Sequence, residues 1–210
     1  MMSNMGWSRF ARRGLTVLAL VVTTFVDAQA AVVVDTYGSD GIANGSGYSL
    51  YADTTYQNYQ KLAVPFALSQ TMHLDNLLAT IAGTGAYKLG IALDVDHLPT
   101  ESFIYSLDVQ DPQTVSVNLD WVLPAGDYWL VALPGPYSSG MWIGGGYDLQ
   151  LPFAFANDRQ SWMGFKDSDA PAMRLLATAV PEPGEAVLGL LGLASLATVV
   201  PYQRRKIRSA

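Results

Sequence analysis

The central part of this 210-residue chain is predicted to be all-β, an antiparallel β-sandwich of a jelly-roll-like kind. The segment "TVSVNLDW", residues 114–121, alternates apolar and polar side chains with the period of two expected of a half-buried strand. Glycine and proline separate the apolar runs at intervals near the 8–12 residues typical of sandwiches. No amphipathic helix pattern of useful length occurs between residues 31 and 179.

The first element, residues 1–30, has the organisation of a secretory signal peptide. A positive segment, an apolar core and a small-residue cleavage site follow one another: Arg9, Arg12 and Arg13, then residues 14–26, then Ala28 and Ala30 before Ala31. We expect Sec export with cleavage by signal peptidase before Ala31. An uncleaved N-terminal anchor is the alternative, and the Arg12–Arg13 pair hints only weakly at twin-arginine export.

Residues 31–179 form the predicted exported β-sandwich domain. The expected strands are 31–36, 62–66, 74–81, 87–93, 103–107, 114–121, 128–133, 141–147 and 173–179. The turn Pro124-Ala125-Gly126-Asp127 separates a half-buried strand from one that is apolar on both faces, so the two are expected to pair as a hairpin. With no cysteine in the chain, the domain must fold without disulfides, and thiolate sites are excluded.

The charge of the domain argues against binding to nucleic acid. It carries fifteen Asp and Glu residues against five Lys and Arg, whereas the other seven basic residues lie in the two ends of the chain. A net charge near −10 repels phosphate backbones and anionic lipid. The same charge is also explained by solubility alone.

The last segment, residues 180–210, combines a proline-rich turn, an apolar run and a basic end. Residues 186–202 carry no charge, and as a helix the sixteen residues from 186 to 201 would extend about 24 Å, a little short of a bilayer core. Arg204, Arg205, Lys206 and Arg208 follow and are expected to stay in the cytoplasm as a stop signal. A buried surface helix is the alternative, but the run has no polar face.

Pro181-Glu182-Pro183, the apolar run and the arginine-rich end together resemble the PEP-CTERM sorting signal of Gram-negative bacteria. That resemblance implies processing near Pro181–Pro183 by an exosortase, and an association with exopolysaccharide and biofilm. It also implies a protein that is first anchored in the inner membrane and then delivered to the cell surface or extracellular matrix. Residues 62–106 and the following "LPAGDYWLVAL" are similar to sandwich domains found ahead of such tails, with residues 94–100 placed in a loop.

The sequence predicts no catalytic residue, no cofactor site and no metal site. His73 and His97 are the only histidines, and neither has further ligands at metal-binding spacing. Acidic residues close together in two segments are interpreted as solvated loops rather than Ca²⁺ ligands: Asp94, Asp96 and Glu101, and Asp167 and Asp169. No Gly-x-Ser-x-Gly motif supports a serine hydrolase.

Aromatic residues are the remaining candidates for binding. Trp142, Tyr147 and Trp162 are candidates for stacking on sugar rings, and Tyr48, Tyr51, Tyr56 and Tyr59 add a tyrosine-rich loop. Packing within the sheet is the competing interpretation. Gly144–Gly146 between two of these aromatic residues are expected to form a bulge or bent strand.

Three functions are therefore compared. The first is a non-enzymatic exported surface or matrix protein, and the second is a carbohydrate-binding module for extracellular polysaccharide. The third is a secreted polysaccharide hydrolase, which would need two carboxyl groups facing each other across a cleft.

Overall fold

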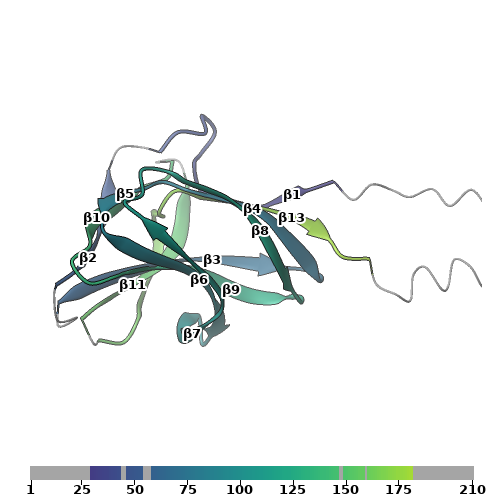
Figure 1. The fold of residues 1–210 in the computed structure, drawn as a ribbon. Helices are drawn as coiled ribbons and strands as arrows, with labels where there is room; N and C mark the ends of the chain where they lie inside the picture. The colour runs from purple at the N-terminus through teal and green to yellow at the C-terminus, as the bar shows by residue number, and fades with distance from the viewer. Residues whose placement is uncertain (1–28, 44–45, 54–57, 147–148, 159, 182–210) are drawn as a thin grey trace, which may run out of the picture.

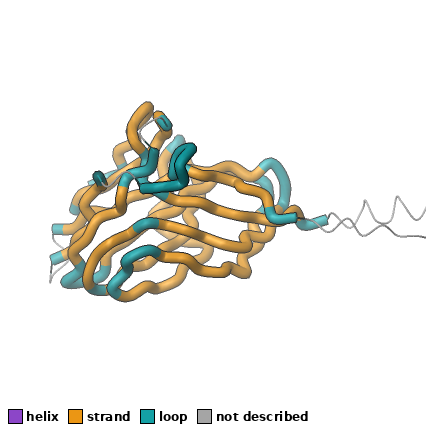
Figure 2. Tube along the Cα trace, turned by 90° about the horizontal axis from the view of Figure 1, so that it is seen from above, coloured by secondary structure: helices purple, strands orange, loops and turns teal. Residues whose placement is uncertain are grey.

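The computed structural model describes residues 29–43, 46–53, 58–146, 149–158 and 160–181 of the chain, and these residues contain strands and loops but no helix (Figure 2). The strands are β1 (Ala31–Asp35), β2 (Gly47–Ala52), β3 (Tyr59–Leu68), β4 (Met72–Ala79), β5 (Ile81–Thr84), β6 (Ala86–Val95), β7 (Leu98–Gln110), β8 (Val115–Leu123), β9 (Gly126–Pro134), β10 (Ser139–Ile143), β11 (Gln150–Asn157), β12 (Met163–Asp169) and β13 (Met173–Ala179). The predicted all-β class is confirmed.

The strands form two antiparallel sheets, an arrangement consistent with a β-sandwich (Figure 1). A four-stranded sheet has the order β1-β13-β4-β8. A nine-stranded sheet has the order β5-β10-β2-β3-β9-β6-β7, and it branches at β3, where the β11–β12 hairpin also pairs. The branch opens the nine-stranded sheet on one side of β3.

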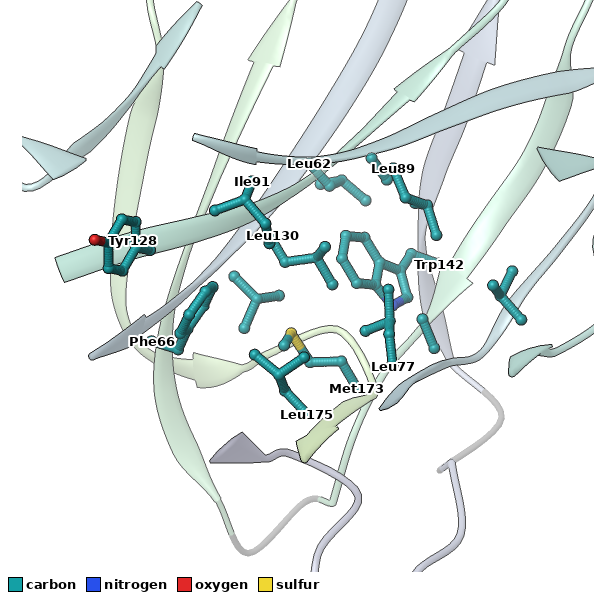
Figure 3. Packing of buried hydrophobic residues seen from close by; sticks show 14 of the residues in the cluster. Leu62, Phe66, Leu77, Leu89, Ile91, Tyr128, Leu130, Trp142, Met173 and Leu175 are labelled. Carbon is teal, nitrogen blue, oxygen red and sulfur yellow. The ribbon is translucent and has the colours of Figure 1, made fainter. Parts of the chain in front are cut away.

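Side chains from both sheets fill the main core (Figure 3). Leu77 and Leu175 of the four-stranded sheet meet Leu62 and Leu130 of the nine-stranded sheet, and all four are buried. Each such side chain contributes about 1.5–3 kcal/mol through its removal from water. Trp142 lies among them, fully buried. The core therefore holds the sheets together without a disulfide.

Strand β9 is buried on both faces, as its apolar sequence predicts. Leu130 points into the main core, while Trp129 and Val131 point to the opposite, outer face of the nine-stranded sheet. A second, smaller core covers that outer face, made by Ala63, Ala92, Trp129, Val131, Ala154, Ala156 and Trp162, with Leu98 and Phe103 packed against it. Small residues in β3, β6 and β11 leave room there for the large rings.

The predicted hairpin between residues 114–121 and 128–133 is wrong. Strand β8 pairs with β4 in the four-stranded sheet, whereas β9 pairs with β3 and β6 in the nine-stranded sheet. The turn from Pro124 to Asp127 therefore carries the chain from one sheet to the other. The physical reason lies in the burial patterns. Strand β8 has one apolar face and fits the narrower, four-stranded sheet, whereas β9 has two apolar faces that must both be buried.

The predicted strand 74–81 is two strands. Thr80 separates β4 from β5, and the chain changes sheets there, because β5 pairs with β10 of the nine-stranded sheet. The Thr80 N–H donates to the Ala172 carbonyl and the Thr80 carbonyl accepts from the Ile143 N–H, so the corner keeps its backbone hydrogen bonds.

The expected loop over residues 94–100 is mostly strand. Val95 pairs with Leu98, which leaves Asp96 and His97 as a two-residue hairpin turn between β6 and β7. Their φ angles of 54° and 64° are those of a type I′ turn, which glycine usually occupies but Asp tolerates. Because the segment contains no glycine, it lacks the usual sequence signal of a tight turn.

Three strands were not predicted: β2, β11 and β12. The expected tyrosine-rich loop contains β2, whose Tyr48 and Tyr51 lie in strand, and Tyr59 begins β3. The expected strand 141–147 is shorter, ending at Ile143 of β10. Gly145 then passes so close to the Thr36 carbonyl that any Cβ there would overlap it, so a glycine is required.

The two ends of the domain lie side by side (Figure 1). Strand β1 pairs antiparallel with β13, and Ala31 faces Ala177. The Val180 N–H donates to the Thr71 carbonyl just beyond β13. Within the described residues, no helix has the length and apolar character needed to cross a membrane, and the predicted span over residues 186–202 lies outside them.

Candidate functional site

A groove of about 640 Å³ lies on the outer side of the nine-stranded sheet, between the tip of the β6–β7 hairpin and the β11–β12 hairpin. It is lined by Pro65, Asp96, His97, Leu98, Trp129, Pro152, Phe153, Gly164, Phe165 and Lys166. Its volume falls within the range of about 300–1,000 Å³ usual for ligand sites. Most of the lining is apolar, and the three charged or titratable side chains stand at the edge.

The groove exists because the ladder between β3 and β11 stops early. Ala63 faces Ala154 in the last registered pair, and the same register places Pro65 opposite Pro152. Proline has no N–H to donate, so the next pair of ladder bonds cannot form. The two strands part there, and both prolines line the groove as well as an adjoining hollow of about 290 Å³ that reaches Val34 of β1.

One wall is the β6–β7 hairpin, which bends over the outer face of the sheet. The pairing register shifts twice between Ile91 and Asp94, and such bulges bend a strand. Asp94 fixes the bent tip: its Oδ2 accepts from Trp129 Nε1 at 2.7 Å, and its Oδ1 accepts from the His97 N–H at 3.0 Å. The orientation of the indole and the shape of the turn are therefore set by the same carboxylate.

The opposite wall is the β11–β12 hairpin, with an aromatic ladder. Phe165 of β12 stacks on Phe153 at 5.2 Å between ring centroids and on Phe155 at 5.1 Å, with interplanar angles of 17° and 19°. Phe153 is buried, whereas 41% of Phe165 is exposed. Phe165 is therefore the aromatic ring that the groove presents to solvent.

A buried lysine joins the two walls at their far end. Lys61 of β3 is 5% exposed, and its ammonium donates to Glu101 of β7 and lies 4.5 Å from the centre of the Trp162 ring, next to β12. A cation over an indole is the favoured cation–π geometry. Leu98 approaches Gly164 at the groove itself. The walls are thus held at two places, which preorganises the groove.

A second polar cluster lies away from the groove, on the outer face of the four-stranded sheet. His73 of β4 is bonded to Asp120 of β8 at 2.8 Å and to Asp75 at 2.6 Å, and Thr178 donates to Asp75. The hydrogen bonds that His73 makes to the carboxylates of Asp120 and, to a smaller extent, Asp75 raise the pKa of His73 above its ordinary value. Among the described residues, no group of three or more His, Asp and Glu side chains has the arrangement of a metal site.

The tryptophans proposed for sugar stacking are not available to a ligand. Trp142 is fully buried in the main core and donates to the Ala172 carbonyl at 2.9 Å, and Trp162 is covered in the second core. This expectation is therefore corrected: Trp142 of β10 faces the main core, and Trp162, in the loop just before β12, packs into the second core. Tyr147 and Tyr56 lie outside the described residues.

The predicted sorting and cleavage residues lie at or beyond the ends of the described chain. Ala30 and Ala31 are exposed, and Pro181 is exposed and outside any strand. Ala28, Glu182 and Pro183 lie outside the described residues, as do Arg204, Arg205, Lys206 and Arg208.

Two of the acidic residues considered for Ca²⁺, Asp94 and Glu101, are engaged in contacts of the β6–β7 hairpin. Asp94 holds Trp129 and the turn, and Glu101 pairs with Lys61. Asp96 is the one carboxylic acid among the described residues that line the groove. A pair of facing carboxyl groups, as a glycoside hydrolase needs, is not formed by the described lining residues.

The groove was not predicted because its residues come from five strands and one turn. The one sequence signal that pointed to it was a proline in each of two apolar runs, Pro65 and Pro152, since proline inside a strand marks an edge or an interruption. Comparison with protein-family models, with curated protein sequences and with solved structures finds no match to the chain.

Proposed function

We propose that this protein is a non-enzymatic exported surface or extracellular-matrix protein, sorted through a PEP-CTERM-like tail. The order of parts in the sequence supports this: a signal peptide, an acidic disulfide-free domain, Pro181-Glu182-Pro183, an apolar run and a basic end. Signal peptidase and an exosortase are its processing partners.

The observation that carries the proposal is the pairing of the two domain ends. Because β1 pairs with β13, the junctions at Ala31 and Pro181 lie at one end of the domain, and both are exposed. Ala30 lies just before β1 and Pro181 lies just beyond β13, so both junctions are at the boundaries of the strands and not inside them. The pairing supports a proposed inner-membrane intermediate in which both ends face the bilayer, with residues 186–202 as the span and the domain, a jelly-roll-like sandwich, outside.

The experiment follows processing in a host that has an exosortase. Deletion of residues 181–183 should leave a protein that is inserted in the membrane but uncut, because the extended proline segment is what the protease threads. Neutral substitution of Arg204, Arg205, Lys206 and Arg208 should instead weaken retention before cutting. Surface delivery unchanged in both variants would contradict the proposal.

A second candidate function, binding of extracellular polysaccharide, is favoured by one observation. The groove between the β6–β7 and β11–β12 hairpins presents Phe165 to solvent inside a mostly apolar hollow. Concave sites with a few polar groups at the edge are typical of small-molecule recognition. Retention of exopolysaccharide at the cell surface would be the corresponding role.

A further inference from the structure

The lining of the groove suits a ligand with one apolar face and polar edges. Its floor and walls include Trp129, Phe165 and the two prolines, which offer carbon surface and no ionised group. Asp96, His97 and Lys166 lie at the edge and are exposed. A carboxylate accepts hydrogen bonds, an ammonium donates them, and an imidazole can do either. A pyranose ring has this division, with C–H groups on its face and hydroxyls around its edge.

The charge of the domain restricts the choice of polymer. Fifteen acidic against five basic residues between 31 and 179 repel a polyanion at long range. The lining holds one carboxylate, Asp96, and one ammonium, Lys166, so no local excess of positive charge offsets this repulsion. A fatty acyl chain would not use the polar edge. The lining and the charge together favour a neutral sugar chain.

We propose that the groove binds a short segment of a neutral polysaccharide, with Phe165 as the stacking platform and Asp96, His97 and Lys166 as hydrogen-bonding partners of the hydroxyls. This proposal rests on the proposed function, because the protein can contact the polymer only if it is exported from the cell. The ion pair of Lys61 with Glu101, its contact with the Trp162 ring and the hydrogen bond from Trp129 to Asp94 hold the two hairpins in place before the ligand binds. Less ordering is then needed on binding.

The test uses the full chain in a detergent without a sugar headgroup, because a maltoside would compete. Titration calorimetry with cellohexaose, xylohexaose and mannohexaose covers three neutral pyranose chains, with a hexamer of galacturonic acid as the anionic comparison. We expect binding of at least one neutral hexamer, and no stronger binding of the acidic one. Phe165→Ala should weaken that binding about tenfold or more, as loss of a central aromatic contact does.

Met163→Ala is the matched control. Met163 lies two residues away on the same strand, is 42% exposed against 41% for Phe165, and does not line the groove. It should leave affinity unchanged. Because Phe165 also packs on two phenylalanines, a second variant, Lys166→Ala, removes an exposed edge donor without disturbing that stack and should weaken binding severalfold.

Each result decides the proposal. Binding of a neutral hexamer that falls in Phe165→Ala and Lys166→Ala but not in Met163→Ala supports it. Absence of binding by all three neutral hexamers, tighter binding of the acidic hexamer, or equal effects of Phe165→Ala and Met163→Ala would overturn it. Tail processing is measured separately, so a cut and delivered protein that binds no hexamer overturns the groove ligand alone.

Discussion

Pro65 and Pro152 occupy facing positions at which the ladder between β3 and β11 ends. The register that joins Ala63 to Ala154 would bring the two prolines face to face two residues further along, and neither has an N–H. In an antiparallel ladder such a pair could otherwise exchange two hydrogen bonds. Two residues in separate strands thus open the nine-stranded sheet and create the groove.

Replacing both prolines by valine should close this opening. In Pro65→Val/Pro152→Val, two new N–H groups can extend the β3–β11 ladder by one pair, and we expect both new amides to exchange slowly with solvent. Hydrogen exchange followed by NMR measures this directly. Each single substitution restores only one donor and serves as the control. New amides that exchange as fast as those of an exposed loop would show that the prolines do not end the ladder.

Two substitutions in the pair of Lys61 and Glu101 should lower the free energy of unfolding by different amounts. Glu101→Gln leaves the ammonium of Lys61 buried without its charged partner, and we expect a loss of about 1–3 kcal/mol in the free energy of unfolding. Lys61→Met removes the charge itself and should cost less, because a buried ion pair replaced by an apolar side chain is often tolerated.

Urea unfolding of the two variants provides the comparison, with Lys88→Met as a control in a more exposed pair with Asp108. A larger loss in Lys61→Met than in Glu101→Gln would mean that the lysine stabilises the protein chiefly through its contact with Trp162.

Gly90 is required by the ring of Phe103. A Cβ at Gly90 would lie 2.5 Å from the Phe103 ring, whereas one at Gly164 would lie 3.4 Å from Leu98. Gly90→Ala should therefore lower the free energy of unfolding by about 1–3 kcal/mol through overpacking, and Gly164→Ala by clearly less. Thermal unfolding of both variants measures the difference, and combining Gly90→Ala with Phe103→Leu should recover part of the loss. Equal effects of the two alanines would rule out the steric explanation.

The alternation of apolar residues was enough to predict the class and most strands, because a buried face imposes a period of two wherever the strand pairs. It could not predict pairing: β8 and β9 are neighbours in sequence but lie in different sheets, and the choice depends on which face of each strand finds cover. Trp142 and Trp162 were misplaced for a related reason, since an indole suits a core and a sugar site equally well from sequence.

The groove depends on contacts that no local pattern contains. Asp94 reaches Trp129 across 35 positions of sequence, and Lys61 reaches Glu101 across 40. The His73–Asp120 bond likewise joins β4 and β8 across 47 positions. Only Pro65 and Pro152 give a local sequence signal of the groove. That they face each other depends on the register between β3 and β11, which the sequence does not reveal.

The His73 cluster predicts a pH dependence of stability. Because the folded state raises the pKa of His73, its protonation stabilises the fold at pH values below the ordinary histidine pKa of about 6.5. That contribution is lost as pH rises through the folded-state pKa. Asp120→Asn should bring the pKa of His73 down toward its ordinary value, measured from the ring carbon shifts by NMR. Asp108 pairs with Lys88 and not with His73, so Asp108→Asn should leave the pKa of His73 unchanged.

The most direct test of the account is the intact mass of the protein recovered from the surface of a host that has an exosortase. We expect a chain that begins at Ala31 and ends near Pro181–Pro183, without the apolar run and without the basic end. A surface-exposed chain that still ends beyond Arg208 would contradict it, because the tail would then be a permanent anchor.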